Sequence, residues 1–232
     1  MAMARVLRFI LYIYTVQCTR PGVKGVPATM PITSRANAMP LPPISSIEGT
    51  RLSLVPVAAE HLDDLLVVNG DEQVTRFVPY ATWTCREDGE RWLARMTALV
   101  EGGTAHQLVL QRKLDARVVG TLLLFKFDEQ SRRIELGYAL GRSCWGLGLM
   151  QEAVTAACRH AFGAMELRRV EAEVNPANEA SCSLLTRVGF VLEGTLRQRW
   201  TAKGSTYDTN IYGLLADEWR AAVSPPNSRS HV

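Results

Sequence analysis

The stretch that decides the fold is residues 142–153, RSCWGLGLMQEA, which connects a strand-like segment to a helix-like one. Gly146 and Gly148 allow the backbone to turn tightly before the helix begins. The first turn of a helix presents unpaired N–H groups and the positive end of the helix dipole, so this turn suits a phosphate group. No Gly-Lys-Ser/Thr and no third glycine follow at the required spacing, which excludes a P-loop and a dinucleotide-binding motif. An ordinary glycine-containing loop is the alternative interpretation.

Hydrophobic periodicity on both sides of this stretch predicts alternating strands and helices. The predicted strands are 51–57, 107–112, 118–127, 133–140, 169–174, 190–196 and 207–215, and the predicted helices are 58–69, 86–100, 149–162 and 179–188. Short polar connections between residues 107 and 140 indicate an antiparallel meander. We therefore expect an α/β (α+β) fold, with one domain over residues 48–220 and a mixed, mostly antiparallel sheet of six to seven strands flanked by helices.

Composition and charge narrow the class of protein. The chain has 232 residues, 47% of them apolar, which is enough for a core without disulfides or metals. The formal net charge of +3 is too small to indicate a nucleic-acid partner. Five cysteines without metal-ligand spacing indicate free thiols in a reducing compartment, so we expect a cytoplasmic protein with no bound metal.

The two ends differ from the rest of the chain. Residues 1–47 contain five basic residues, no acidic ones and six of the eleven prolines, which predicts a flexible extension, and residues 221–232 form a polar tail. The apolar run 6–16 is shorter than the about 20 residues that a membrane span needs. A secretory signal or an organelle transit peptide would fit this composition, and the alternative interpretation is that translation begins at Met30 or Met39.

A second informative stretch is residues 171–181, EAEVNPANEAS, which runs from the end of a predicted strand into a helix. Asn178 lies where a helix N-cap is expected, and Ser181 faces the same opening three residues later. Capping alone would explain Asn178. Gly189 follows the predicted helix, as a C-cap does.

Taken in order, seven segments resemble the N-acetyltransferase (GNAT) superfamily, and within it the RimJ/RimL-type branch, over about residues 50–216. They are 50–54 (TRLSL), 71–77 (DEQVTRF), 135–138 (ELGY), 145–153 (WGLGLMQEA), 171–181 (EAEVNPANEAS), 189–194 (GFVLEG) and 207–208 (YD). The resemblance implies acetyl-CoA as cosubstrate and direct transfer of the acetyl group to an amine. It also implies a V-shaped opening between the fourth and fifth strands.

The resemblance further implies which residues bind the cosubstrate. The glycine-containing loop would hold the CoA pyrophosphate through backbone N–H groups, and Asn178 would hydrogen-bond the pantetheine arm. The family pattern begins with Gln or Arg, where this chain has Ser143, with Arg142 one residue earlier. The expected cofactor-binding residues are Leu140, Arg142, Ser143, Trp145, Gly146, Leu147, Gly148, Leu149, Met150, Asn175 and Asn178.

Catalysis requires a proton acceptor, because only a neutral amine attacks a thioester. Glu135 and Glu173 match positions where superfamily members carry an active-site carboxylate, although solvated or ion-paired glutamates are the alternative for both. Ser181 matches the serine near the thioester sulfur, and Leu140 or its neighbours could supply a backbone N–H to the oxyanion. Tyr138 is expected to be a sheet residue. Trp200 stands where the Rim enzymes have a further glutamate, and it could stack on a substrate or cover a loop.

These observations predict an acetyl-CoA-dependent N-acetyltransferase whose acceptor is a protein N-terminal amine or a small-molecule amine. The alternative, which the departures at Ser143 and Trp200 keep open, is a non-catalytic acyl-CoA-binding regulatory module. We expect a monomer or homodimer with a small-molecule or peptide amine as partner, no nucleic acid and no membrane span.

Overall fold

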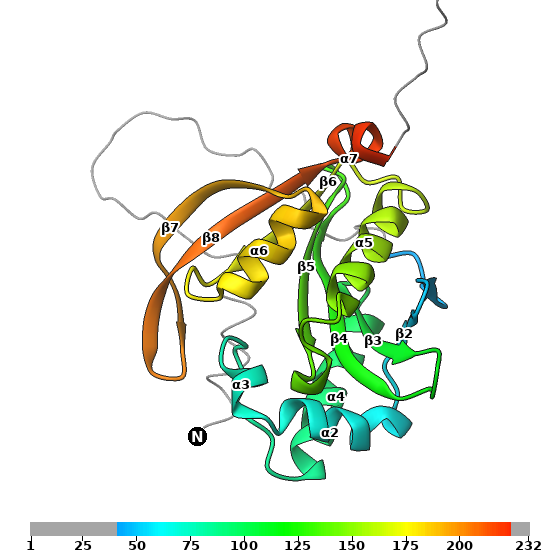
Figure 1. Cartoon of the computed structure of the whole chain (residues 1–232), viewed down its shortest axis with the longest axis vertical. Helices are drawn as coiled ribbons and strands as arrows, with labels where there is room; N and C mark the ends of the chain where they lie inside the picture. Colours follow the sequence, from blue (N-terminus) through cyan, green and yellow to red (C-terminus); the bar gives the residue numbers. More distant parts are fainter. Residues whose placement is uncertain (1–40, 224–232) are drawn as a thin grey trace, which may run out of the picture. The chain divides into compact units, whose positions relative to one another are not determined.

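A computed structural model describes residues 41–223, and the predictions for residues 1–40 and 224–232 lie outside this range. Its centre is an eight-stranded sheet in the order β1-β2-β3-β4-β5-β6-β8-β7 (Figure 1). The strands are β1 (Ile47–Glu48), β2 (Leu52–Pro56), β3 (Ala105–Arg112), β4 (Val118–Asp128), β5 (Arg133–Leu140), β6 (Arg169–Val174), β7 (Val191–Ala202) and β8 (Ser205–Leu215). The expected meander is β3-β4-β5, and the count exceeds the predicted six to seven because β1 adds a two-residue strand.

One pair of strands differs from all the other pairs of the sheet. β5 and β6 are parallel, whereas the remaining pairs are antiparallel. Their pairing covers only three positions and ends at Glu135 opposite Glu171. Beyond that point β5 continues to Leu140 and β6 to Val174 without pairing, so the two strands diverge. This is the opening predicted between the fourth and fifth strands, which are β5 and β6.

Helices cover the sheet on two faces. The helices are α2 (Leu62–Asn69), α3 (Glu72–Thr75), α4 (Arg86–Glu101), α5 (Leu149–Phe162), α6 (Glu179–Val188) and α7 (Ala216–Val223), with single 3-10 turns η1 (Ala59–His61) and η2 (Arg142–Cys144). The apolar stripe of α5 packs with Leu108 and Ile134 in the larger core, and α6 adds Leu185. Val109, the neighbour of Leu108, faces α2 and α4 in a second core around Trp83 and Trp92. Side chains of adjacent strand residues thus point to opposite faces of the sheet and pack in different cores.

The structure follows the predicted elements closely in the middle of the chain and departs from them at both ends. Helices α5 and α6 have the predicted bounds. Residues 41–47, expected in the extension, contribute three buried side chains to the larger core: Leu41, Ile44 and Ile47. Residues 221–223, expected in the tail, complete α7. Within residues 41–223, no helix has the length and apolar character needed to cross a membrane.

Candidate active site

The glycine-containing loop adopts the tight turn that the sequence predicts. Gly146 and Gly148 have φ angles of +74° and +72°, a region that favours glycine, and Gly148 is the N-cap of α5. The first helical bond of α5 runs from Glu152 N to Gly148 O, so the preceding N–H groups have no partner within the helix. A Cβ on Gly146 would meet nothing within 4 Å, so the turn is open on that side. The donors and the space fit a pyrophosphate.

Arg51 attaches this loop to the start of β2. Its Nη1 donates to Leu147 O at 2.9 Å, and its Nε donates to Glu152 Oε2 at 2.7 Å. The backbone N–H groups of Arg51 and Leu52 donate to the other oxygen of Glu152, at 2.6 and 3.2 Å. In the sequence, Arg51 stood out only as a member of one segment that resembles the GNAT superfamily. Its contact with Glu152 joins residues about a hundred positions apart, and local sequence patterns do not reveal such a contact.

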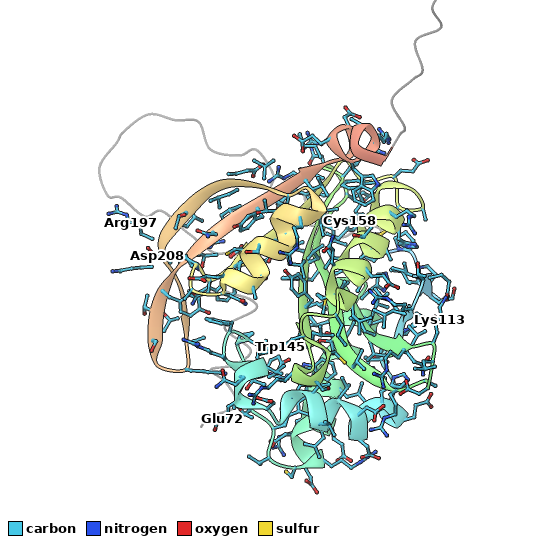
Figure 2. The ribbon with its side chains drawn as sticks, in the orientation of Figure 1. Glu72, Lys113, Trp145, Cys158, Arg197 and Asp208 are labelled. Carbon is cyan, nitrogen blue, oxygen red and sulfur yellow. The ribbon has the colours of Figure 1, made fainter. Side chains whose placement is uncertain are left out.

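The remaining loop residues divide into exposed and buried side chains. Trp145 and Leu147 are 47% and 55% exposed, and Trp145 Nε1 donates to Leu140 O at 2.8 Å, where Figure 2 shows it at the end of β5. Leu149 and Met150 are buried in the core, so only their backbone can contact a ligand.

Arg142 and Ser143 lie in η2, before the glycine turn. Arg142 is 3.9 Å from Asp71, and both η2 residues line a cavity of about 770 Å³ between this turn, α2 and the β3–β4 connection. The structure thus places the Arg142 guanidinium beside Asp71, the N-cap residue of α3.

The start of α6 faces the diverging strands. Asn178 Oδ1 accepts from Ser181 N at 3.2 Å, which is the capping role, and leaves the amide Nδ2 as the group that can donate to a ligand. Asn175 Oδ1 accepts from Ala177 N at 2.9 Å and shapes the turn before the helix. Both residues thus organise the loop that joins β6 to α6.

Ser181 and Tyr138 form a hydroxyl pair between α6 and β5. The two oxygens are 2.6 Å apart, and Ser181 is 9% exposed. Burial raises the pKa of Tyr138, although the hydrogen bond with Ser181 lowers it in part, so the phenol stays protonated at neutral pH. Tyr138 is therefore more than the sheet residue that the sequence suggested.

Glu135 and Glu173 come together around one lysine. Lys126 Nζ lies 2.7 Å from Glu135 Oε2 and 3.1 Å from Glu173 Oε1. Trp200 Nε1 donates to Glu173 Oε2 at 2.7 Å, and Arg199 Nη2 lies 3.4 Å from Oε1. Both glutamates are thus ion-paired, as the alternative interpretation allowed. No sequence pattern pointed to Lys126 or to the contact between Trp200 and Glu173.

The two carboxylates differ in proton affinity. Burial raises the pKa of Glu135 to about 7, although the charge of Lys126 and its hydrogen bond lower it in part. Burial also acts to raise the pKa of Glu173, but the charge of Lys126 and the hydrogen bond from Trp200 outweigh it, so the pKa is lowered. Near neutral pH, Glu173 is an anion and Glu135 can both accept and release a proton.

The hydroxyl pair and the carboxylates lie on opposite faces of the sheet. Ile134, Leu136 and Tyr138 of β5 face the core formed with α5 and α6, so Glu135 between them faces the other side. Ala172 and Val174 of β6 face the same core, which puts Glu173 beside Glu135. Beyond Glu135 and Glu171 the two strands do not pair with each other, so the hydroxyl pair and the carboxylates lie on either side of this unpaired region.

Comparison with known proteins agrees with this architecture. The family model for the acetyltransferase (GNAT) domain matches residues 51–191. The chain therefore belongs to the GNAT acetyltransferase family and is an N-acetyltransferase. Its relatives include proteins named as ribosomal-protein N-acetyltransferases, and the solved structures that share its fold include RimL and RimJ.

Three similar proteins show how far the likeness extends. An uncharacterized N-acetyltransferase, p20, of Bacillus licheniformis is 32% identical over 169 residues, which is 73% of this chain and 95% of that protein. The ribosomal protein uS5-alanine N-acetyltransferase of Escherichia coli (strain K12) is 36% identical over 84 residues, 36% of this chain and 43% of that protein. A crystal structure of a GCN5-related N-acetyltransferase from Brucella melitensis superposes with a TM-score of 0.72 at 26% identity, covering 80% of this chain and 86% of that one.

Proposed function

We propose that the protein transfers the acetyl group of acetyl-CoA directly to a primary amine in the opening between β5 and β6. The observation that carries the proposal is the placement of two functional groups on either side of this opening. Ser181, a hydroxyl donor, lies on one face, and Glu135, a buried carboxylate with a pKa of about 7, lies on the other. A leaving thiolate needs a donor and an attacking ammonium needs a proton acceptor, and the two groups meet these needs.

The residues that would hold the cosubstrate follow from the contacts above. The backbone N–H groups of residues 148–150 precede the first helical bond of α5 and can donate to the pyrophosphate, and Asn178 Nδ2 can donate to the pantetheine arm. Acetyl-CoA supplies an activated acyl carbon and a thiolate leaving group. Ser181 Oγ–H then donates to the sulfur, while Tyr138 Oη–H donates to Ser181 and keeps its hydroxyl oriented.

The proton of the acceptor goes to Glu135. An α-amine has a pKa near 8, about one unit above that of Glu135, whereas a lysine amine has a pKa near 10.4. The smaller gap makes transfer of the proton from an α-ammonium to Glu135 less unfavourable than transfer from a lysine ammonium. We therefore propose a peptide N-terminal amine as the acceptor, which agrees with the name of the relative that acetylates an alanine of ribosomal protein uS5.

Thiol release from acetyl-CoA tests the proposal. The acceptors are short peptides that begin with Ala or Ser, the same peptides with a blocked N-terminus and one internal lysine, and a polyamine. We expect release with the free α-amines, confirmed by mass spectrometry of the acetylated peptide. Release only with the lysine peptide or the polyamine would contradict the acceptor class. A melting temperature raised by acetyl-CoA without release on any amine would identify a non-catalytic acyl-CoA-binding module instead.

A further inference from the structure

Lys126 lies in an irregular part of β4, one residue after the position that pairs with Glu135. The β4–β5 register shifts between Phe125, which pairs with Glu135, and Asp128, which pairs with Arg133. Two residues of β4 therefore oppose one residue of β5, which is a β-bulge. Lys126 has a φ of +52°, in the left-handed region that lysine adopts at an energetic cost. The bulge turns its side chain toward Glu135 and Glu173, and strain of this kind is concentrated at functional sites.

The Lys126 ammonium is partly buried and contacts both carboxylates and aromatic rings. The side chain is 25% exposed, and its Nζ bridges the two carboxylates at 2.7 and 3.1 Å. The ring of Phe125 lies 5.3 Å away and that of Trp200 lies 6.0 Å away, so aromatic faces cover the cation. A partly buried ammonium between two carboxylates stays charged.

The two carboxylates differ in the hydrogen-bond donors around them. Glu173 has donors in Trp200 and Arg199 in addition to Lys126. Among the described residues, Lys126 is the one donor of a hydrogen bond to the Glu135 side chain. The other charged groups facing the pair are Glu171 on β6 and its partners Arg133 and Arg169. Of the two carboxylates, Glu135 is therefore the one that is protonated at the lower cost in free energy.

We propose that Lys126 is a positioning residue that holds Glu173 as a permanent anion and leaves Glu135 as the carboxylate that exchanges the proton with the acceptor amine. The inference rests on the proposed function of Glu135 and deepens it. The acceptor ammonium loses its proton to a Glu135 oxygen, and the neutral nitrogen forms a bond to the acyl carbon. The bond from this carbon to sulfur then breaks, and the leaving thiolate takes up the second proton that the nitrogen releases. Lys126 itself neither gains nor loses a proton in this step.

The test measures the titration of Glu135 directly and does not need an acceptor. Glutamate carboxyl carbons are labelled with ¹³C, and their shifts are followed against pH in the full-length protein. One resonance should titrate near pH 7 and should be missing in Glu135→Gln. In Lys126→Met, that resonance should titrate at least about one pH unit higher, because the ionised carboxylate has lost a neighbouring positive charge. Lys126→Arg should keep the wild-type titration.

Lys113→Met is the matched control. Lys113 Nζ pairs with Glu48 at 2.7 Å, the same length as the Lys126–Glu135 contact, but on the exposed surface. We expect this variant to leave the resonance near pH 7 and the transfer rate unchanged. If Lys126→Met does not fold, Lys126→Gln, which keeps an N–H donor but not the charge, replaces it.

Kinetics provide the second readout. With one peptide acceptor, the acidic limb of kcat should move to higher pH in Lys126→Met, so that activity falls about tenfold near pH 7 and recovers in alkaline buffer. A merely structural residue would lower activity equally at all pH values. An unchanged Glu135 titration in a folded Lys126→Met protein would overturn the inference. A wild-type protein that transfers no acetyl group, while its Glu135 titration shifts as described, would count against the proposed function alone.

Discussion

The hydroxyl of Tyr138 lies 2.6 Å from the hydroxyl of Ser181, and this hydrogen bond joins β5 to the helix that follows β6. It is a direct polar link between the two sides of the opening, as is the ion pair of Arg133 on β5 with Glu171 on β6. Because the phenol stays protonated, Tyr138 can donate to Ser181, and in that arrangement Ser181 can donate in turn to a third group. The pair thus directs one proton donor toward the opening.

We expect Ser181→Ala to lower kcat about 10- to 100-fold with little change in the KM for acetyl-CoA, because the lost interaction is made to the developing thiolate. Tyr138→Phe should cause a smaller loss, since it removes only the group that orients Ser181. Steady-state kinetics on one peptide acceptor give both values. An unchanged kcat in Ser181→Ala would remove this serine from the mechanism.

Glu135→Gln removes the proton acceptor but preserves the shape of the side chain. We expect kcat to fall by about 100-fold or more near neutral pH, and the loss to persist in alkaline buffer. Binding of acetyl-CoA, measured by calorimetry, should be unaffected. If Glu173→Gln proves the more damaging change, the roles of the two carboxylates are reversed.

The same residue makes the stability of the protein depend on pH. The pKa of Glu135 is raised to about 7 from the ordinary value of 4.5, so between these pH values the native state holds a proton that the unfolded chain releases. Stability is therefore lost as the pH rises through this window, by up to the order of 3 kcal/mol. Glutamine does not titrate, so Glu135→Gln should gain stability relative to wild type as the pH rises from 4.5 to 7. Urea unfolding at a series of pH values measures the difference.

Gly146→Ala tests the loop without introducing a clash. A Cβ there meets nothing within 4 Å, so the cost of about 1–2 kcal/mol comes from the left-handed backbone alone. We expect acetyl-CoA to bind about tenfold more weakly, because the turn that presents the N–H groups is destabilised. Gly194→Ala is the control, since that glycine also faces open space but has no left-handed φ. Equal affinities in the two variants would show that the turn is not part of the binding site.

Arg51→Met tests whether the loop must be attached to β2. We expect the KM for acetyl-CoA to rise several-fold, because Leu147 O loses the donor that fixes the loop. The Arg51 side chain is 51% exposed, so the loss of its ion pair with Glu152 should cost less than about 1 kcal/mol of stability. Arg220→Met, which removes an exposed ion pair with Asp217 in α7, is the control. A similar rise in KM in both variants would mean that the effect is not local.

The sequence predicts best those parts of the molecule whose signals are local and long. Helices α5 and α6 have the expected bounds because each carries an apolar stripe over several turns and is bordered by glycine. The two-residue β1 and the single-turn α3 are too short to show a period. The β7–β8 hairpin is longer than expected, because β7 is exposed along most of its length and has no buried face to mark it.

The candidate site shows the same division. Gly146, Gly148, Asn178 and Ser181 stand at element boundaries, where residue type and position indicate a role. The contact between Lys126 and Glu173 joins positions 47 residues apart and depends on a bulge. A bulge changes which face a side chain occupies, and residue periodicity does not report it.

The short pairing between β5 and β6 has a consequence for the complex. Past Glu135 and Glu171, the facing edges of both strands present backbone N–H and C=O groups that no neighbouring strand satisfies. A linear molecule with amide groups of its own can lie between them and bond to either side, as a ninth strand would. Such a cosubstrate would also be a structural component, because it would bridge β5 and β6 over the part of the sheet where the two strands do not pair with each other.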